Sequence, residues 1–209
     1  MDIVIIVGGQ LGDLEFSHKV ASCANYIICC DSGADHALKM GITPHLLVGD
    51  MDSISDSAAM AFKGIPAKKY NPEKDKTDLS LAIEIAISKK PANISILASF
   101  GGDRLDHVLG NIHALLPAAK LGIEAQMLSN NIKATIINNY AKLARAGFSY
   151  ISLIPMGNVA TGISTVGLKY PIDNGSLHMG TTLGISNEFI EDFAEIHVKE
   201  GILLAICTK

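Results

Sequence analysis

Short apolar runs alternate with helical patterns over about the first 130 residues. The runs of strand length are Ile3–Val7, Tyr26–Cys30, Leu46–Val48, Ile94–Ala98 and Ala125–Leu128. This alternation is typical of a parallel sheet whose strands are joined by crossover helices. We therefore predict an α/β domain with a mostly parallel sheet over residues 1–130.

Two of the intervening segments have apolar residues at helical spacing. The first covers residues 79–87 and follows Thr77 and Asp78, which are residue types that cap the start of a helix. The second covers residues 105–116, and Pro117 should end or kink it. Both segments are predicted to be amphipathic helices.

After about residue 145 the pattern changes to short strands separated by glycine and asparagine. The expected strands are Tyr150–Pro155, Gly167–Pro171, Gly180–Ile185, Glu195–Val198 and Ile202–Cys207. The last two are separated by Lys199-Glu200-Gly201, which predicts a closing β-hairpin. We predict a second, all-β domain over residues 131–209. Because so small a domain buries little surface alone, it should pack on a neighbour or on a second subunit.

Composition and charge exclude several classes of partner. The 209 residues are 48% hydrophobic with a net charge of −4, so the chain can bury a core but has no electrostatic footprint for nucleic acid. It has no polybasic run for a membrane surface and no apolar stretch long enough to span one. We expect a small-molecule partner and a cytoplasmic location, since no secretory pattern follows Met1.

The four cysteines do not form a metal-binding or disulfide pattern. Cys29 and Cys30 are adjacent in a predicted strand and point to opposite faces, while Cys23 and Cys207 form no CxxC pair. Reduced thiols are the expected state.

Aspartates follow the predicted strands. They are Asp31, then Asp50 and Asp52, then Asp103 and Asp106, with Asp75 and Asp78 before a predicted helix. The carboxyl ends of parallel strands meet at one edge of a sheet, so these carboxylates should converge there. Like charges raise each other's pKa unless a cation lies among them, and Mg²⁺ prefers carboxylate oxygens. If the backbone is extended at Asp50 and Asp52, both side chains project to the same side, as metal ligands would.

Two glycine pairs favour a phosphate ligand. Gly8-Gly9 follows the first strand, and Gly101-Gly102 precedes a helix, whose N-terminus attracts anions. Neither pair matches the Walker A motif or the dinucleotide fingerprint. Arg104, two residues beyond the second pair, could offer a planar donor fork to phosphate oxygens.

Each residue also has a structural interpretation. Any one strand-end aspartate could be a helix cap or a turn residue, and we assign Asp103 to that role. His107 is interpreted as a solvated histidine in the first turn, and Arg104 could be a surface residue. It is the recurrence of aspartates, rather than any one of them, that favours a site.

Several segments resemble the thiamine pyrophosphokinase family in order and spacing. They are Asp31-Ser32-Gly33-Ala34-Asp35, Gly41-Ile42-Thr43-Pro44, Gly49-Asp50-Met51-Asp52-Ser53-Ile54, Asp75-Lys76-Thr77-Asp78, Gly101-Gly102-Asp103-Arg104-Leu105-Asp106-His107 and Ser186-Asn187-Glu188. The chain departs from the family pattern at Ser32 and Asp35, where glycine and asparagine are common, and it has no tryptophan to stack on thiamine.

The resemblance implies a fold and an activity. It implies a Rossmann-like α/β nucleotide-binding catalytic domain and a C-terminal β-sandwich that binds thiamine and forms a homodimer, with active sites between subunits. The implied reaction transfers pyrophosphate from ATP to the thiamine hydroxyl and gives thiamine diphosphate and AMP, with Mg²⁺ as cofactor.

The resemblance also assigns roles to residues. By similarity, Asp50, Asp52 and Asp75 hold Mg²⁺, and Asp31, Thr77, Asp78 and Arg104 line the ATP phosphates. To these the glycine argument adds Gly8, Gly9 and Gly102 as ATP-binding residues. The expected catalytic residues are Asp75, Arg104 and Asp106, and the expected thiamine contacts are Asp106, Ser186 and Asn187.

Two other functions fit the same residues. One is a different Mg²⁺-dependent transferase or hydrolase, for instance a pyrophosphokinase for another small alcohol. The other is a non-catalytic sensor of nucleotide or thiamine, which would not need the full set of metal carboxylates together with Arg104.

Overall fold

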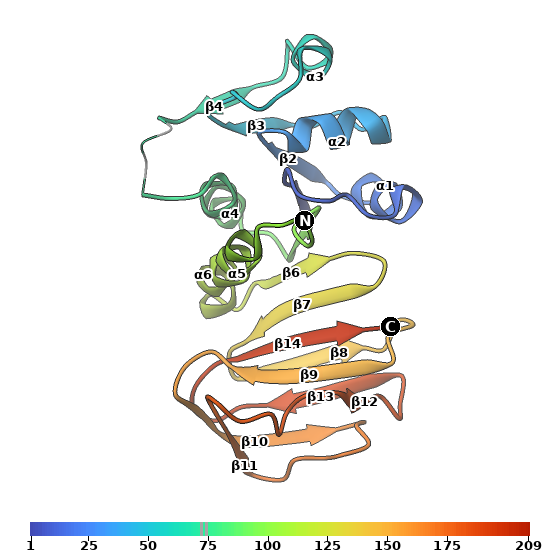
Figure 1. Ribbon diagram of the computed structural model, residues 1–209, viewed down its shortest axis with the longest axis vertical. Helices are drawn as coiled ribbons and strands as arrows, with labels where there is room; N and C mark the ends of the chain where they lie inside the picture. Colours follow the sequence, from blue (N-terminus) through green and yellow to red (C-terminus); the bar gives the residue numbers. More distant parts are fainter. Residues whose placement is uncertain (72, 74) are drawn as a thin grey trace. The chain divides into compact units, whose positions relative to one another are not determined.

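The chain divides into two compact units, residues 1–130 and residues 131–209 (Figure 1). The structure is a computed structural model that describes residues 1–71, 73 and 75–209. Within this described part, no helix is both long enough and apolar enough to cross a membrane.

The first unit is a parallel sheet with helices in its crossover connections. Its strands are β1 (Asp2–Ile6), β2 (Tyr26–Cys30), β3 (Leu46–Gly49), β4 (Ala67–Lys69), β5 (Asn93–Leu97) and β6 (Glu124–Leu128). Its helices are α1 (Leu14–Ser22), α2 (Gly33–Met40), α3 (Asp56–Ala61), α4 (Asp78–Ser88), α5 (Leu105–Ala114) and α6 (Leu116–Lys120). The strand order β6-β5-β1-β2-β3-β4 is parallel throughout, which confirms the predicted α/β class.

The order of these strands reverses between β1 and β5. From β1 the chain adds β2, β3 and β4 on one side, and then β5 and β6 on the other. In open α/β sheets, ligands bind outside the carboxyl ends of the strands at such a switch point. The fold therefore directs attention to the residues that follow β1 and β5.

Both predicted helices of this unit are confirmed. Thr77 caps α4, because its Oγ1 accepts a hydrogen bond from the backbone N–H of Ser80 at 3.2 Å. Helix α5 ends at Ala114, and Pro117 lies in the first turn of α6, where its missing N–H costs no helical hydrogen bond. Proline thus interrupts the helical segment as expected.

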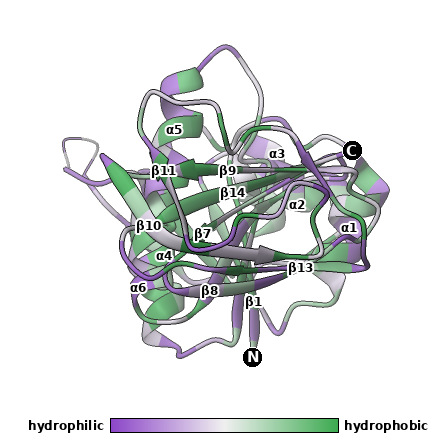
Figure 2. Cartoon of the chain, turned by 90° about the horizontal axis from the view of Figure 1, so that it is seen from below, coloured by the Kyte–Doolittle hydropathy of each residue, from purple (hydrophilic) through white to green (hydrophobic). Residues whose placement is uncertain are grey.

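The second unit has two antiparallel sets of strands. They are β7 (Ile132–Ile137), β8 (Tyr140–Ala144), β9 (Tyr150–Pro155), β10 (Val159–Val166), β11 (Gly175–His178), β12 (Asn187–Glu188), β13 (Phe193–His197) and β14 (Leu203–Thr208). One set has the order β12-β9-β14-β7 and the other β11-β10-β13-β8. Both sets contribute to one hydrophobic core, and hydrophobic residues are prominent on strands such as β9 and β14 (Figure 2).

The predicted closing hairpin is wrong. Strand β13 pairs with β8 and β10, whereas β14 pairs with β7 and β9, so residues 199–201 pass from one sheet to the other. Within this link, the carbonyl of Glu200 accepts a hydrogen bond from the N–H of Thr161 at 2.9 Å. A short polar link between two apolar runs does not by itself distinguish a hairpin from a crossing between sheets.

Two further predicted strands are also wrong. In the run Gly167–Pro171, Leu168 makes only an isolated bridge to Phe189, and in the run Gly180–Ile185 the chain turns. Gly167 and Gly180 have φ angles of +79° and +85°, which lie in the left-handed region rather than in the extended region of a regular strand. The strands in this region are instead β10 and β11.

Candidate active site

A crevice of about 980 Å³ lies in the first unit, at the carboxyl ends of strands β1, β2, β3 and β5. It occupies the point where the strand order reverses. Residues that line it include Gly8, Gly9, Gln10, Asp31, Ser32, Asp50, Ser53, Asp75, Lys76, Thr77, Asp78, Ser99, Gly101, Gly102, Asp103, Arg104, Asp106, His107 and Asn111.

The glycines of the crevice are required by close approach and by backbone conformation. A Cβ atom at Gly8 would collide with the hydroxyl of Ser32, and one at Gly9 would collide with the carbonyl oxygen of Ala98. Gly101 and Gly102, just before α5, have φ angles of +79° and +83°. These positions leave backbone exposed to a ligand, which supports the phosphate interpretation.

Three strands are followed, within two residues, by a non-glycine residue with left-handed backbone. The φ angles are +43° at Asp31 after β2, +69° at Met51 after β3 and +57° at Ala98 after β5. Such conformations cost energy, and they concentrate at active sites and ligand clamps. The strain here lies along one edge of the sheet, at the crevice.

The left-handed Met51 corrects one premise of the sequence analysis. The segment Asp50-Met51-Asp52 is not extended, so alternation does not place both carboxylates on one side. Instead the backbone N–H of Asp52 donates to Asp50 Oδ1 at 3.1 Å. Asp50 lines the crevice, while Asp52 is exposed and is not among the lining residues.

The pKa of the Asp31 carboxyl is raised above its ordinary value. Burial is the largest cause, and a hydrogen bond with the Asp78 side chain and the nearby negative charges add to it, raising the pKa to about 6. The N–H of Met51, which donates to Asp31 Oδ1 at 3.2 Å, acts in the opposite direction. A cation at this position would relieve the repulsion among these carboxylates, so the oxygen donors fit Mg²⁺.

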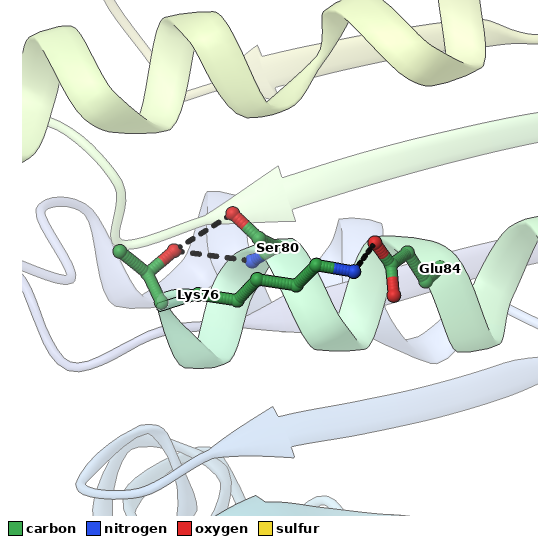
Figure 3. Close-up of polar contacts among 4 residues, drawn as sticks. Lys76, Ser80 and Glu84 are labelled. Carbon is green, nitrogen blue, oxygen red and sulfur yellow. Dashed lines mark hydrogen bonds and ion pairs between the residues drawn. The ribbon is translucent and has the colours of Figure 1, made fainter. Parts of the chain in front are cut away.

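The N-terminus of α4 brings Asp75, Thr77 and Asp78 to the crevice. The Thr77 hydroxyl is engaged locally, since its Oγ1 lies 2.9 Å from Ser80 Oγ as well as accepting from the Ser80 N–H (Figure 3). Lys76 lies just before this helix, and its ammonium is 2.6 Å from Oε1 of Glu84, which is on the helix.

Arg104 and Asp106 bind each other. Arg104 donates through Nε to Asp106 Oδ1 at 3.0 Å and through Nη2 to Oδ2 at 2.8 Å. This hydrogen-bonded pairing lowers the pKa of Asp106 to about 2 and raises that of Arg104. Both side chains are about two-thirds exposed, so the pair is accessible to ligands.

The crevice collects most of the residues predicted for one site. Its lining includes the predicted ATP-binding, catalytic and metal residues Gly8, Gly9, Asp31, Asp50, Asp75, Thr77, Asp78, Gly102, Arg104 and Asp106. Of the predicted metal ligands only Asp52 is not among them. Among the residues that the structure describes, no three or more metal-binding side chains are already arranged around one point. The metal assignment stays a prediction.

Sequence reasoning missed several crevice residues. Asp103 was assigned to a turn or cap; it lies in a bend before α5, whose N-cap position is taken by Arg104, and it lines the crevice as well. Asn111 also lines the crevice, and its Nδ2 donates to the Ser99 carbonyl at 3.2 Å. Its position one helical turn after His107 was the available signal.

The predicted thiamine contacts Ser186 and Asn187 belong to the second unit. Ser186 has a φ of +58°, and its N–H donates to Ser152 Oγ at 3.0 Å. The Asn187 amide holds the backbone of Tyr170, accepting from its N–H at 3.0 Å and donating to its carbonyl at 2.7 Å. Tyr170 is 60% exposed. No sequence pattern predicts that this aromatic residue is bonded to Asn187.

A parallel α/β sheet with glycine turns and carboxylates at its switch point is typical of the class of α/β proteins that bind phosphate-bearing ligands. A family model described as "Thiamin pyrophosphokinase, catalytic domain" matches residues 17–127, and "Thiamin pyrophosphokinase, vitamin B1 binding domain" matches residues 135–203. The chain belongs to the thiamin pyrophosphokinase family.

Relatives and solved structures agree with this membership. The chain is 36% identical to the thiamine pyrophosphokinase of Bacillus subtilis (strain 168) over 180 residues, covering 84% of each chain. The crystal structure of thiamine pyrophosphokinase from Bacillus subtilis superposes with a TM-score of 0.89 at 30% identity, covering 100% of this chain and 99% of that one. A thiamin pyrophosphokinase structure from Geobacillus thermodenitrificans gives 0.87 at 28% identity, with 100% and 98% covered.

Proposed function

We propose that this chain is a thiamine pyrophosphokinase that transfers the pyrophosphoryl group of ATP to the hydroxyl of thiamine, giving thiamine diphosphate and AMP. The main observation in support is the crevice, where glycine turns, aspartates and Arg104 of the matched catalytic domain line one cavity. A nucleotide or thiamine sensor would have no need of Arg104 together with several carboxylates in one cavity.

The crevice supports a magnesium cofactor. Asp50 and Asp75 would hold the ion, with Asp52 as a further predicted ligand, and Asp31 and Asp78 supply more carboxylate oxygen nearby. When bound, Mg²⁺ would supply positive charge beside these carboxylates to offset the negative charge that develops on the phosphates.

The transfer itself requires positioning more than covalent chemistry from the protein. The thiamine hydroxyl attacks the β-phosphorus of ATP, in line with departure of AMP. Arg104 turns its donor fork from Asp106 to the phosphate oxygens, and Asp106 then orients the hydroxyl or accepts its proton. Gly8, Gly9 and Gly102 let the backbone approach the polyphosphate closely.

The second unit would contribute the thiamine site. We infer a β-sandwich that binds thiamine through Ser186 and Asn187, with the exposed ring of Tyr170 as the aromatic surface in a chain without tryptophan. A homodimer with active sites between subunits and a cytoplasmic location complete the proposal. Size-exclusion chromatography with light scattering tests the dimer, and a monomeric mass would contradict it.

The decisive test is product analysis. The purified chain is incubated with ATP, MgCl₂ and thiamine, and thiamine diphosphate and AMP are quantified by chromatography. Equal amounts of both products are expected, and chelation of Mg²⁺ should stop their formation. ADP in place of AMP, or no product with thiamine but product with another small alcohol, would contradict the proposed function.

A further inference from the structure

The crevice has an excess of negative charge, although its proposed ligand is a polyanion. Six aspartates line it, but Lys76 and Arg104 are its only lysine and arginine among the described lining residues. The guanidinium of Arg104 is bound to Asp106 inside the crevice. The second cation, Lys76, is held by a residue outside the lining.

Lys76 is one of the residues that line the crevice, but its ammonium pairs with a residue outside the lining. Its stem runs along helix α4 to Glu84, where Nζ and Oε1 are 2.6 Å apart (Figure 3). Glu84 is eight residues further along the chain, on the exposed side of α4, and does not line the crevice. The side chains of both residues are about half exposed.

An exposed ion pair of this kind contributes little to stability, because water screens it and two long side chains must be ordered. A polyphosphate offers more negative charge and several acceptor oxygens, and lysine binds phosphate as a flexible point charge. Lys76 can therefore exchange Glu84 for a phosphate at small cost, since only the side chain has to turn.

We propose that Lys76 is a binding residue for the pyrophosphoryl group of the nucleotide, and that Glu84 holds it outside the crevice until the nucleotide binds. The inference rests on the proposed function, because it assumes a nucleoside triphosphate in the crevice. Glu84 competes with the phosphates for Lys76, so it weakens nucleotide binding in the wild-type chain.

The competition predicts effects of opposite sign. Lys76→Met should raise the Kd for α,β-methylene ATP, which lacks the scissile oxygen, by about tenfold. Glu84→Gln should lower that Kd by about two- to threefold, because it removes the competitor. In the double variant, Glu84→Gln should have no further effect. Lys76→Arg keeps the charge and should bind nearly as the wild type does. Isothermal titration calorimetry measures each value.

A second ligand and a matched pair of variants identify the contact. AMP lacks the pyrophosphoryl group, so its Kd should be unchanged by Lys76→Met. Lys142 and Glu195 form a similar exposed pair at 3.1 Å in the second unit, and Lys142→Met and Glu195→Gln should leave nucleotide binding unchanged.

The outcomes separate this inference from the proposed function. If thiamine diphosphate forms but Lys76→Met leaves the Kd for α,β-methylene ATP unchanged, Lys76 is no ligand and the inference fails alone. If Glu84→Gln lowers only the melting temperature, the pair is structural and the inference also fails. If no thiamine diphosphate or AMP forms, the proposed function fails first.

Discussion

The two ends of the same strands differ sharply in the first unit. At the amino ends of β1, β2 and β5, polar groups satisfy one another: the N–H of Asp2 donates to Asn25 Oδ1 at 2.8 Å, and Asn93 Nδ2 donates to Asp2 Oδ1 at 2.9 Å. At the carboxyl ends, Asp31 and Asp78 share a hydrogen bond among like charges, and left-handed backbone recurs.

This difference separates stability from function within one sheet. Both edges carry polar side chains, so polarity alone does not mark a site. Mutual repulsion and backbone strain cost free energy, and an edge that bears both is maintained for a ligand rather than for folding. Substitutions at the two edges should therefore change different quantities.

The largest effect is expected for Asp50→Asn. Removing one proposed magnesium ligand in the crevice should lower kcat by about a hundredfold or more, because charge neutralisation dominates this chemistry. Steady-state assays over a range of MgCl₂ measure it. Asp2→Asn, at the opposite edge, is the control and should retain activity. Asp52→Asn should have a smaller effect than Asp50→Asn, because only Asp50 lines the crevice. The reverse order would show that Asp52, rather than Asp50, is the principal magnesium ligand.

Arg104→Ala should lower kcat/KM for ATP by about a hundredfold, since one preorganised donor to developing charge is lost. Arg104→Lys should recover only part of this activity, because lysine lacks the planar fork. Activity equal to the wild type in Arg104→Ala would mean that the residue serves only to pair with Asp106.

Asp31→Asn should stabilise the protein in a pH-dependent way while reducing activity. The folded pKa is raised from 3.8 to about 6, so the wild type is relatively stabilised below about pH 4 and loses that contribution as the pH rises through 6. The melting temperature of the variant should exceed that of the wild type by a few degrees (about 2–4 °C) at pH 7.5 without Mg²⁺ and match it near pH 4. An advantage that is equal at both pH values would exclude the titration of Asp31 as its cause.

The smallest effect is expected at the amino edge. Asn93→Ala removes an exposed hydrogen bond to Asp2 and should reduce the free energy of unfolding by about 0.5–1 kcal/mol without changing kcat/KM. Urea denaturation and the same assay test both halves. A loss of activity here would remove the contrast between the two edges.

Sequence reasoning was effective in the first unit because apolar runs there are regular and helices separate them. Parallel strands all end at the same edge, so the aspartates after β2 and β3 could be brought together without knowing any register. What it could not supply was local backbone geometry. The left-handed Met51, which turns Asp52 from the crevice lining, has no clear signal in the residue type.

The second unit was harder because antiparallel strands must be assigned to partners. Glycines such as Gly167 and Gly180 were interpreted as lying within strands, whereas they mark positive-φ turns beside β10 and β11. The hydrogen bond between Asn187 and Tyr170 joins positions 17 residues apart, and no pattern in the sequence predicts it.

Strand β14 sets the order in which the second unit can be completed during synthesis. It lies between β7 and β9, so the first and third strands of this unit become neighbours of the last one only after residues 203–208 have left the ribosome. Until then β7 and β9 each present an edge that β14 will cover, where another nascent chain could pair. A chaperone that shields exposed strand edges would thus be most useful to this protein until residues 203–208 have emerged from the ribosome and paired.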